Sequence, residues 1–483
     1  MRIELGNGGM TLLSIAEITN GVLCASDAEK MLRITSVATD SREVSQGTLF
    51  LGIRGERVDG NDFAQKALEN GASAVLGERL PDGCAGILVS DTVMALGRLA
   101  KAVRSQHDIP TVAVTGSVGK TTTKELLYSV LSAHFIAHAS KGNYNSNIGL
   151  PMSVLECGSE AEAAVYELGM SAPMEIDYLT RLIEPEIGLI TNIGTAHMES
   201  LGSRENIAKA KLEIVNGMQE GSTLLLSGDE PLLREAKHAV SARGIRTLYV
   251  SVEPCEEQTG FADLRAFHIR SEIGHTLFDL RYGDRIFKDF SLNVMGVHTV
   301  YAATFAIGVG LLLGIPEAEL RAGLTAFKAA PMRQSIETIG GVTVIEDCYN
   351  ASPESMRAAL DVAEAIAKKQ GHGRVLAMLG DMRELGTESS AMHEGVGRYA
   401  ARVGVHHLFT FGAESSEFLS AGAASSGIPE DRIFREKDST DATAITEQIL
   451  REMREGDVLL VKASRALRAE RIVALLKEKT ANR

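Results

Sequence analysis

The feature that most constrains the fold is a series of nearly continuous apolar runs, each followed by a helical pattern. The runs are TVAVTG, AAVYELG and EIGLITNIG, which begin at Thr111, Ala163 and Glu186. Strands in a parallel sheet have this composition because helices cover both faces of the sheet. We therefore predict an α/β protein whose middle part contains a mostly parallel sheet.

Three domains are predicted, because 483 residues are too many for one hydrophobic core. Residues 1–106 mix short strand-like and helical stretches, as small α/β units do. Residues 107–330 contain the buried runs and the alternating segments HTLFDLRY and FSLNVMG, which indicate antiparallel strands. Pro331 is predicted to break a helix, and a new series of strands and helices then forms a third domain over residues 331–483.

Composition and charge exclude several classes of function. The formal charge is −14, and the absence of any run of five or more like charges disfavours non-specific nucleic-acid binding. The five cysteines have neither a CxxC pair nor metal-ligand spacing, so reduced thiols and no zinc site are expected. No apolar stretch reaches about 18 residues and no signal-peptide pattern is present. A soluble, cytoplasmic protein without membrane insertion is therefore predicted.

The segment TGSVGKTTT lies between a predicted strand and a predicted helix. Gly116 and Gly119 would let backbone amides face an anion, while Lys120 supplies a charge and Thr121 a hydroxyl for magnesium. The complete phosphate-loop pattern has a glycine where this chain has Val114, so the match is shortened. The strand-loop-helix context favours nucleotide binding over a plain turn.

Two polar residues follow later strands of the same series. Glu167 closes the second run and His197 follows the third. The carboxyl ends of parallel strands line the ligand crevice of an α/β sheet, so both residues could face the same phosphates. Together with Thr121 they could bind magnesium, although magnesium prefers oxygen ligands. For His197 alone, a hydrogen-bonded loop histidine is the simpler interpretation.

A lysine falls on the apolar face of a predicted helix in SRENIAKAKLEIVNGM. Lys211 lies on that face, whereas Lys209 and Glu213 fit the solvated face. A lysine held on an inner face has a lowered pKa and can react as the neutral amine. The alternative is that its long side chain reaches the surface. The apolar face is formed by Ile207, Ala210, Ile214 and Met218.

Motifs along the whole chain resemble the Mur ligases, ATP-dependent amide-forming enzymes of peptidoglycan precursor synthesis. They are TDSREVSQGTLFLGIRGERVDGNDF, TGSVGKTTTKELL, GNYNSNIGLP, YELGM, TNIGTAHMESLGS, AKAKLEI, EDCYNASPESMRAAL, LGDMRELG and VKASRALRAERIV. The last three distinguish the members, and LGDMRELG and VKASR are most similar to those that join D-alanyl-D-alanine to UDP-N-acetylmuramoyl-tripeptide. The resemblance implies a domain for the UDP-linked acceptor, a central P-loop ATPase domain, and a C-terminal Rossmann-like domain that binds the dipeptide. It also implies an acyl-phosphate intermediate.

The resemblance implies roles for individual residues. Lys211 would carry a carbamate formed with carbon dioxide and, with Lys120 and His197, would be catalytic. Two magnesium ions would be bound by Thr121, Glu167, His197 and the Lys211 carbamate. Ser41 and Arg42 would bind the uridine-diphosphate end of the acceptor, and Asn350 would lie near the dipeptide. ATP would be bound by Gly116, Ser117, Val118, Gly119, Lys120, Thr121, Thr122, Asn145, Arg333 and Asp347.

Some positions depart from the family pattern. Thr299 and Ala302 replace asparagines that are frequent in the family, which puts a side-chain contact to adenine in doubt. Tyr301 or Phe305 could pack against the base, although core packing is the simpler interpretation of both. The phosphate and metal residues are retained, so catalysis is expected.

Several alternatives stay open. They are a Mur-type ligase that adds a single amino acid, a folylpolyglutamate synthase, a P-loop phosphotransferase and a silent nucleotide-binding scaffold. The TDSR segment disfavours the folate enzyme, LGDMRELG disfavours the other Mur steps, and the joint presence of Lys120, Glu167, His197 and Lys211 disfavours the scaffold. We expect a monomer with small-molecule substrates. The sequence does not distinguish meso-diaminopimelate from L-lysine as the third residue of the acceptor.

Overall fold

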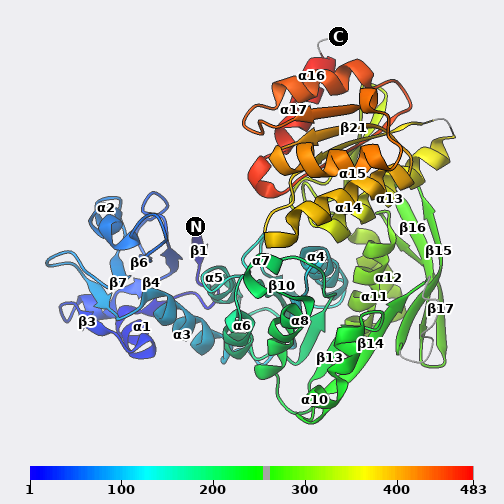
Figure 1. Ribbon diagram of the computed structural model, residues 1–483. Helices are drawn as coiled ribbons and strands as arrows, with labels where there is room; N and C mark the ends of the chain where they lie inside the picture. The colour runs from blue at the N-terminus through cyan, green and yellow to red at the C-terminus, as the bar shows by residue number, and fades with distance from the viewer. Residues whose placement is uncertain (254–261, 372, 482–483) are drawn as a thin grey trace.

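The computed structural model describes residues 1–253, 262–371 and 373–481, and its strands form three large sheets, one in each of three domains (Figure 1). The predicted α/β class is confirmed. Cys255 lies outside the described residues; Cys24, Cys84, Cys157 and Cys348 are free thiols. Among the described helices, none is long and apolar enough to cross a membrane.

The first domain contains a six-stranded sheet in the order β1-β5-β6-β7-β8-β3, which is parallel from β5 to β8. Helix α3 (Thr92–Arg104) packs against α5 and α6 of the central domain and so joins the two domains. The strands are β1 (Arg2–Glu4), β3 (Val22–Cys24), β5 (Ser36–Ala38), β6 (Thr48–Gly52), β7 (Ala74–Gly77) and β8 (Gly86–Leu88), with a separate pair β2 (Met10–Thr11) and β4 (Arg33–Ile34). The other helices are α1 (Leu12–Thr19) and α2 (Ala64–Glu69).

The central domain contains a nine-stranded sheet in the order β10-β11-β9-β12-β13-β14-β15-β16-β17. Its pairs are parallel from β10 to β15, and β15, β16 and β17 pair antiparallel, as the alternating segments predicted. The strands are β9 (Thr111–Thr115), β10 (Ala137–Ala139), β11 (Ala163–Glu167), β12 (Ile187–Ile190), β13 (Thr223–Ser227), β14 (Arg246–Val252), β15 (Leu264–Glu272), β16 (His275–Tyr282) and β17 (Arg285–Leu292).

Helices cover both faces of this sheet, which explains the continuous apolar runs. Every residue of β9 is buried; Val112 and Val114 belong to one hydrophobic cluster, and Ala113 between them belongs to the other. The two sides of β9 therefore contribute to two different cores. The helices are α4 (Lys120–Leu131), α5 (Gly149–Glu156), α6 (Glu175–Ile183), α7 (Met198–Leu201), α8 (Arg204–Leu212), α9 (Pro231–Glu235), α10 (Lys237–Ser241), α11 (Val297–Leu312) and α12 (Glu317–Ala326).

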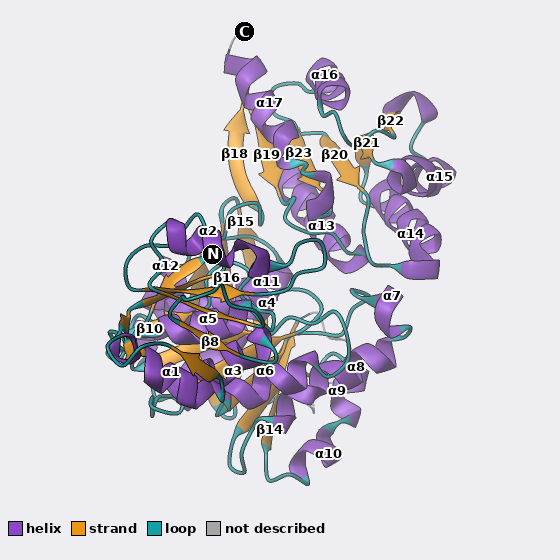
Figure 2. Ribbon diagram, turned by 90° about the vertical axis from the view of Figure 1, so that its left-hand side faces the viewer, coloured by secondary structure: helices purple, strands orange, loops and turns teal. Residues whose placement is uncertain are grey.

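The C-terminal domain contains a six-stranded sheet in the order β18-β19-β23-β20-β21-β22, in which only β18 is antiparallel to its neighbour. In both overall views it lies beside α7 of the central domain, away from the first domain (Figures 1 and 2). The strands are β18 (Ser335–Ile339), β19 (Val342–Glu346), β20 (Val375–Gly380), β21 (Val405–Phe411), β22 (Ile433–Glu436) and β23 (Val458–Lys462). The helices are α13 (Pro353–Gln370), α14 (Ser389–Arg402), α15 (Ser420–Ser425), α16 (Thr443–Glu452) and α17 (Glu470–Ala481).

One local prediction was wrong and another was incomplete. Helix α12 ends at Ala326, so Pro331 lies in the connection and does not itself break the helix. Glu213 is partly exposed and follows α8, which ends at Leu212; its carboxylate accepts from the backbone N–H groups of Met174 (2.8 Å) and Asp177 (3.2 Å). Glu213 thereby supplies acceptors for donors at the start of α6 that the helix leaves unpaired. The domain boundaries stay predictions.

Candidate active site

A cavity of about 1060 Å³ lies where the three domains meet. Its walls include the loop after β9, the end of β11, the loop before α7, the start of α13 and the loop after β20. Val93 and Met94 of α3 add a contribution from the first domain. The carboxyl ends of the central strands therefore face one space that is reached from all three domains, as expected for an α/β sheet.

The loop from Gly116 to Lys120 has the backbone of a phosphate-binding turn. Gly116 and Gly119 have φ angles of 146° and 84°, which favour glycine. A side chain at Gly116 would lie 1.9 Å from Thr191 Oγ1, so the loop needs glycine there for space as well. Helix α4 begins at Lys120, and the N-terminus of a helix attracts anions.

The Lys120 side chain folds back over this loop. Its Nζ donates to the carbonyl oxygen of Gly116 at 2.7 Å, and burial lowers its pKa, against the opposing effect of the Glu167 carboxylate. The Ser117 hydroxyl is buried and has no hydrogen-bond partner among the described residues. Lys120 and Ser117 thus provide a charge and a donor that a phosphate group can use.

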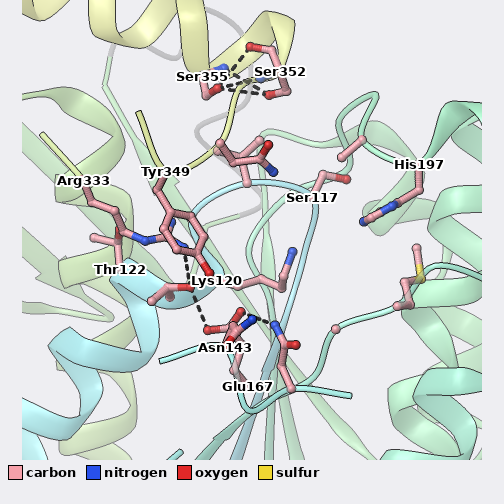
Figure 3. Close-up of a pocket in the computed structure, with 18 of the residues that line it drawn as sticks. Ser117, Lys120, Thr122, Asn143, Glu167, His197, Arg333, Tyr349, Ser352 and Ser355 are labelled. Atoms are coloured by element: carbon pink, nitrogen blue, oxygen red, sulfur yellow. Dashed lines mark hydrogen bonds between the residues drawn. The ribbon is translucent and has the colours of Figure 1, made fainter. Parts of the chain in front are cut away.

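Thr121 and Glu167 both line the cavity and contact each other, and Figure 3 shows Glu167 below Lys120. Thr121 Oγ1 donates to Glu167 Oε2 at 2.8 Å, and Asn145 Nδ2 donates to Glu167 Oε1 at 2.9 Å. Arg333, from the third domain, donates through Nη2 to Thr121 Oγ1 at 2.9 Å. A carboxylate and a hydroxyl are oxygen donors of the kind that Mg²⁺ prefers, so this pair fits that ion.

A buried lysine that the sequence analysis missed supports Glu167. Lys124, one turn after Lys120, donates to the carbonyl oxygen of Ser140 (2.7 Å) and to Glu125 Oε1 (2.5 Å). The Ser140 hydroxyl in turn accepts from the backbone N–H of Glu167 at 3.1 Å. The only available signal was that Lys124 lies on the same side of α4 as Lys120, four residues earlier.

His197 is oriented toward the cavity and is paired across the domain boundary (Figure 3). Its Nδ1 lies 2.7 Å from Glu384 Oε2, and this contact holds the pKa of Glu384 below its usual range. Both residues have left-handed backbones, with φ angles of 65° and 66°. Among the described residues, no group of three or more His, Cys, Asp or Glu side chains is arranged to hold a metal ion.

Lys211 is buried, as its position on the apolar face predicted, and does not reach the surface. Its side chain is 1% exposed and is not part of the cavity wall. Burial, and then the positive charge of Lys120, hold its pKa well below the usual value. Within the described part of the chain its amine has neither a hydrogen bond nor an ion pair. A lowered pKa increases the share of the neutral amine, which is the form that reacts with carbon dioxide.

Residues of the third domain complete the cavity. The guanidinium of Arg333 stacks on the ring of Tyr349 at 4.0 Å from its centre. Buried Lys462 pairs with Asp347 Oδ2 at 2.6 Å and donates to the carbonyl oxygen of Asn350 at 3.1 Å. Lys462 therefore contacts both Asp347 and Asn350. The sequence predicted these two residues as part of the site but did not predict Lys462.

The remaining predicted residues lie elsewhere or have other partners. Ser41 and Arg42 are in the first domain and do not line the cavity; Arg42 pairs with Asp40 at 2.6 Å. The Thr299 hydroxyl lines the cavity but donates to the carbonyl oxygen of Gly296 at 2.6 Å. Phe305 is fully buried in the core, and Tyr301 packs against the same core. For Phe305 the simpler interpretation, core packing, therefore holds.

Three parts of the chain match domains of one family. Residues 33–104 match "Mur ligase family, catalytic domain", residues 114–310 match "Mur ligase middle domain", and residues 333–465 match "Mur ligase, glutamate ligase domain". The matched segments fall within the three predicted domains.

Similar proteins cover nearly the whole chain. A UDP-N-acetylmuramoyl-tripeptide–D-alanyl-D-alanine ligase of Bacillus subtilis (strain 168) is 37% identical, with 96% of this chain and 97% of that protein covered. A crystal structure of MurF from Acinetobacter baumannii is 29% identical with a TM-score of 0.86, covering 98% of this chain and 100% of that one. MurF ligase from Thermotoga maritima in complex with ADP is 28% identical with a TM-score of 0.80, covering 92% and 98%.

Proposed function

The chain belongs to the Mur ligase family, and from this premise we infer that it joins D-alanyl-D-alanine to UDP-N-acetylmuramoyl-tripeptide in peptidoglycan precursor synthesis. ATP is consumed, and ADP and phosphate are formed. Similarity over nearly the full length of a relative with that activity supports this function. The structural observation that best supports this function is the hydrogen bond from Arg333 to Thr121. It brings a residue of the third domain into contact with the end of the phosphate loop.

The reaction proceeds in two chemical steps. An oxygen of the tripeptide carboxylate attacks the γ-phosphorus of ATP; a P–O bond forms, and ADP leaves with the electron pair of the broken bond. The amine of the dipeptide then attacks the acyl-phosphate carbon, a C–N bond forms, phosphate leaves, and the amine proton passes to solvent. Lys120 lies in the loop where negative charge builds up, and preorganised positive groups of this kind stabilise such transition states.

The nucleotide would be bound by residues from two domains. Residues Gly116 to Thr122 surround the phosphates, and Asn145, Arg333 and Asp347 line the same cavity as most of that loop. Ser41 and Arg42 bind the uridine-diphosphate end of the acceptor in the first domain, and Asn350 contacts the dipeptide. We place the domain boundaries after residues 106 and 330.

Thr121, Glu167 and His197 would hold two magnesium ions together with a carbamate on Lys211. When bound, magnesium supplies positive charge that offsets the charge of the triphosphate. The hydroxyl and carboxylate oxygens of Thr121 and Glu167 fit such an ion, and the partnerless, buried amine of Lys211 fits carbamylation. His197 would use Nε2, since its Nδ1 faces Glu384.

The enzyme would act in the cytoplasm as a monomer. One chain supplies the phosphate loop, the third-domain contacts and the first-domain residues around the cavity, which supports a complete site in each molecule. ATP and nucleotide-linked acceptors are cytoplasmic substrates, which supports that compartment.

The function is tested by measuring phosphate release with purified enzyme, ATP and the acceptor in its diaminopimelate and lysine forms, with and without D-alanyl-D-alanine. We expect steady release only when both substrates are present, and a UDP-N-acetylmuramoyl-pentapeptide by mass spectrometry. The preferred acceptor identifies the third residue. Steady release that is indifferent to the dipeptide would instead indicate a phosphotransferase, and release that requires single amino acids would indicate another Mur-type step.

A further inference from the structure

The start of α13 brings one carboxylate to the phosphate loop. Glu354 Oε1 accepts from the backbone N–H (3.1 Å) and the hydroxyl (3.0 Å) of Thr195, which lies two residues before His197 in the central domain. Oε2 accepts from the same hydroxyl at 3.3 Å. The third domain thus places a carboxylate on the central domain, inside the cavity that they share.

Glycine at position 194 allows this close approach. A side-chain carbon at Gly194 would lie 3.1 Å from Glu354 Cδ and 3.2 Å from Ser117 Cβ. Gly194 therefore lies between the Glu354 carboxylate and Ser117 of the phosphate loop, and both can approach it because it has no side chain. A larger residue at position 194 would push the carboxylate and the loop apart.

The charge of Glu354 has no positive partner in this arrangement. Its hydrogen-bond donors are a neutral amide and a neutral hydroxyl, and no ion pair involves it within the described parts of the chain. A carboxylate without a cationic partner is repelled by a triphosphate bound in the neighbouring loop, unless a cation lies between the two anions. Glu167, by contrast, lies with Thr121, where magnesium fits.

Next to Glu354, the face of α13 that lines the cavity carries small side chains. Glu354, Ser355, Ala358 and Ala359 all line the cavity, and residues four apart lie on the same side of a helix. This part of the cavity wall therefore has the Glu354 carboxylate at one end and the methyl groups of Ala358 and Ala359 about one helical turn away. Pro353 and the capping pair of Ser352 and Ser355 stabilise the first turn of the helix, which carries Glu354.

We propose that Glu354 binds the ammonium group of the incoming dipeptide, which makes it a specificity-determining residue of the ligase reaction. This inference rests on the proposed function. At neutral pH most of a peptide's α-amino group is protonated, because its pKa is about 7.7–8.0. The carboxylate binds this cation beside the phosphate loop, and the alanine methyl groups of the dipeptide face Ala358 and Ala359. After the ammonium group loses one proton to solvent, the neutral amine lies close to the place where the acyl phosphate forms.

The test is the Glu354→Gln variant, which keeps oxygen as an acceptor for Thr195 and removes only the charge. We expect the KM for D-alanyl-D-alanine to rise at least tenfold, while the KM values for ATP and the acceptor stay within twofold. Glu354→Asp, which restores the charge, should recover part of the loss. The matched control is Glu364→Gln on the same helix, whose carboxylate pairs with Lys368 (2.8 Å) outside the cavity and whose loss should leave all three KM values unchanged.

Hydroxylamine separates this proposal from the proposed function. It is uncharged at neutral pH and traps an acyl phosphate as the hydroxamate without any dipeptide. We expect wild-type enzyme and Glu354→Gln to form the acceptor hydroxamate at equal rates. An unchanged dipeptide KM in the variant, or a loss of hydroxamate in the variant alone, would overturn the role of Glu354 in binding ammonium. Absence of hydroxamate with the wild-type enzyme would count against the ligase mechanism itself.

Discussion

His197 and Glu384 join the central and C-terminal domains through a contact of 2.7 Å between Nδ1 and a carboxylate oxygen. The same segments meet again through the backbone, where the Glu199 N–H donates to the Glu384 carbonyl oxygen at 3.2 Å. The packing of the third domain against the central domain therefore orients a histidine that faces the cavity. Domain closure that completes a site and excludes water is a common basis of ligase chemistry.

Glu384→Gln should weaken this closed arrangement moderately. The Glu384 side chain is 58% exposed, and a charged contact at such a position contributes about 0.2–1 kcal/mol, which corresponds to a change in the ratio of closed to open molecules of at most about fivefold. We expect kcat to fall by at most that factor. Steady-state rates of the variant and the wild type measure this effect. Glu388→Gln, an exposed carboxylate four residues later, serves as the control and should behave as wild type.

Glu167→Gln should lower kcat much more than Glu384→Gln does, because it impairs the binding of magnesium. The carboxylate is 3% exposed and accepts from Thr121 and Asn145, so the amide would turn its own N–H donors toward groups that already donate. We expect kcat to fall by about 100-fold to 1000-fold, with a higher Mg²⁺ concentration needed for half-maximal rate. A magnesium titration of the rate measures this. Glu162→Gln, at the opposite end of β11, is the matched control; an equal loss there would show that the effect of the first variant is not local.

Lys211 should make the stability of the protein depend on alkaline pH. Its pKa is lowered in the folded chain, so the folded state binds fewer protons than the unfolded state between that lowered pKa and the usual 10.5. Stability therefore rises with pH across this interval and is lowest below the folded pKa, where the buried charge must be accommodated.

The comparison of Lys211→Met with wild type isolates this contribution. Apparent Tm values in buffer free of carbon dioxide, at about pH 7 and about pH 10, should show a gain for wild type that the variant lacks. Lys209→Met, on the exposed side of the same helix, should keep the wild-type gain. Equal pH dependence of wild type and Lys211→Met would contradict a depressed pKa at this lysine.

The two loop glycines should differ in their tolerance of alanine. At Gly116 a methyl group would lie 1.9 Å from Thr191 Oγ1, whereas at Gly119 nothing lies within 4 Å. Gly119→Ala then carries only the strain of its φ angle, about 1–2 kcal/mol, while Gly116→Ala must also displace Thr191. We expect Gly116→Ala to abolish ATP binding and Gly119→Ala to weaken it. Calorimetric titration with ATP measures both, and equal affinities would show that the Thr191 contact is unimportant.

Local sequence patterns determined much of the fold and part of the site. Apolar runs predicted the buried strands because helices cover both faces of a parallel sheet. Every residue of such a strand is then buried, as in Thr111–Thr115. The glycines and Lys120 predicted the phosphate loop because its backbone conformation is set within five residues. Glu167 could be placed because a residue that ends a buried strand must lie at the sheet edge.

Only the tertiary structure decided how the domains meet at the site. No periodicity indicates that Glu384 pairs with His197, that Glu354 reaches Thr195, or that Arg333 contacts Thr121, since these residues are separated by 187, 159 and 212 positions. Such contacts depend on how the three domains dock, and docking is set by the shapes of whole surfaces. The sequence by itself therefore determined the three α/β domains and the phosphate loop, and the packing of those domains against one another determined which charges complete the site.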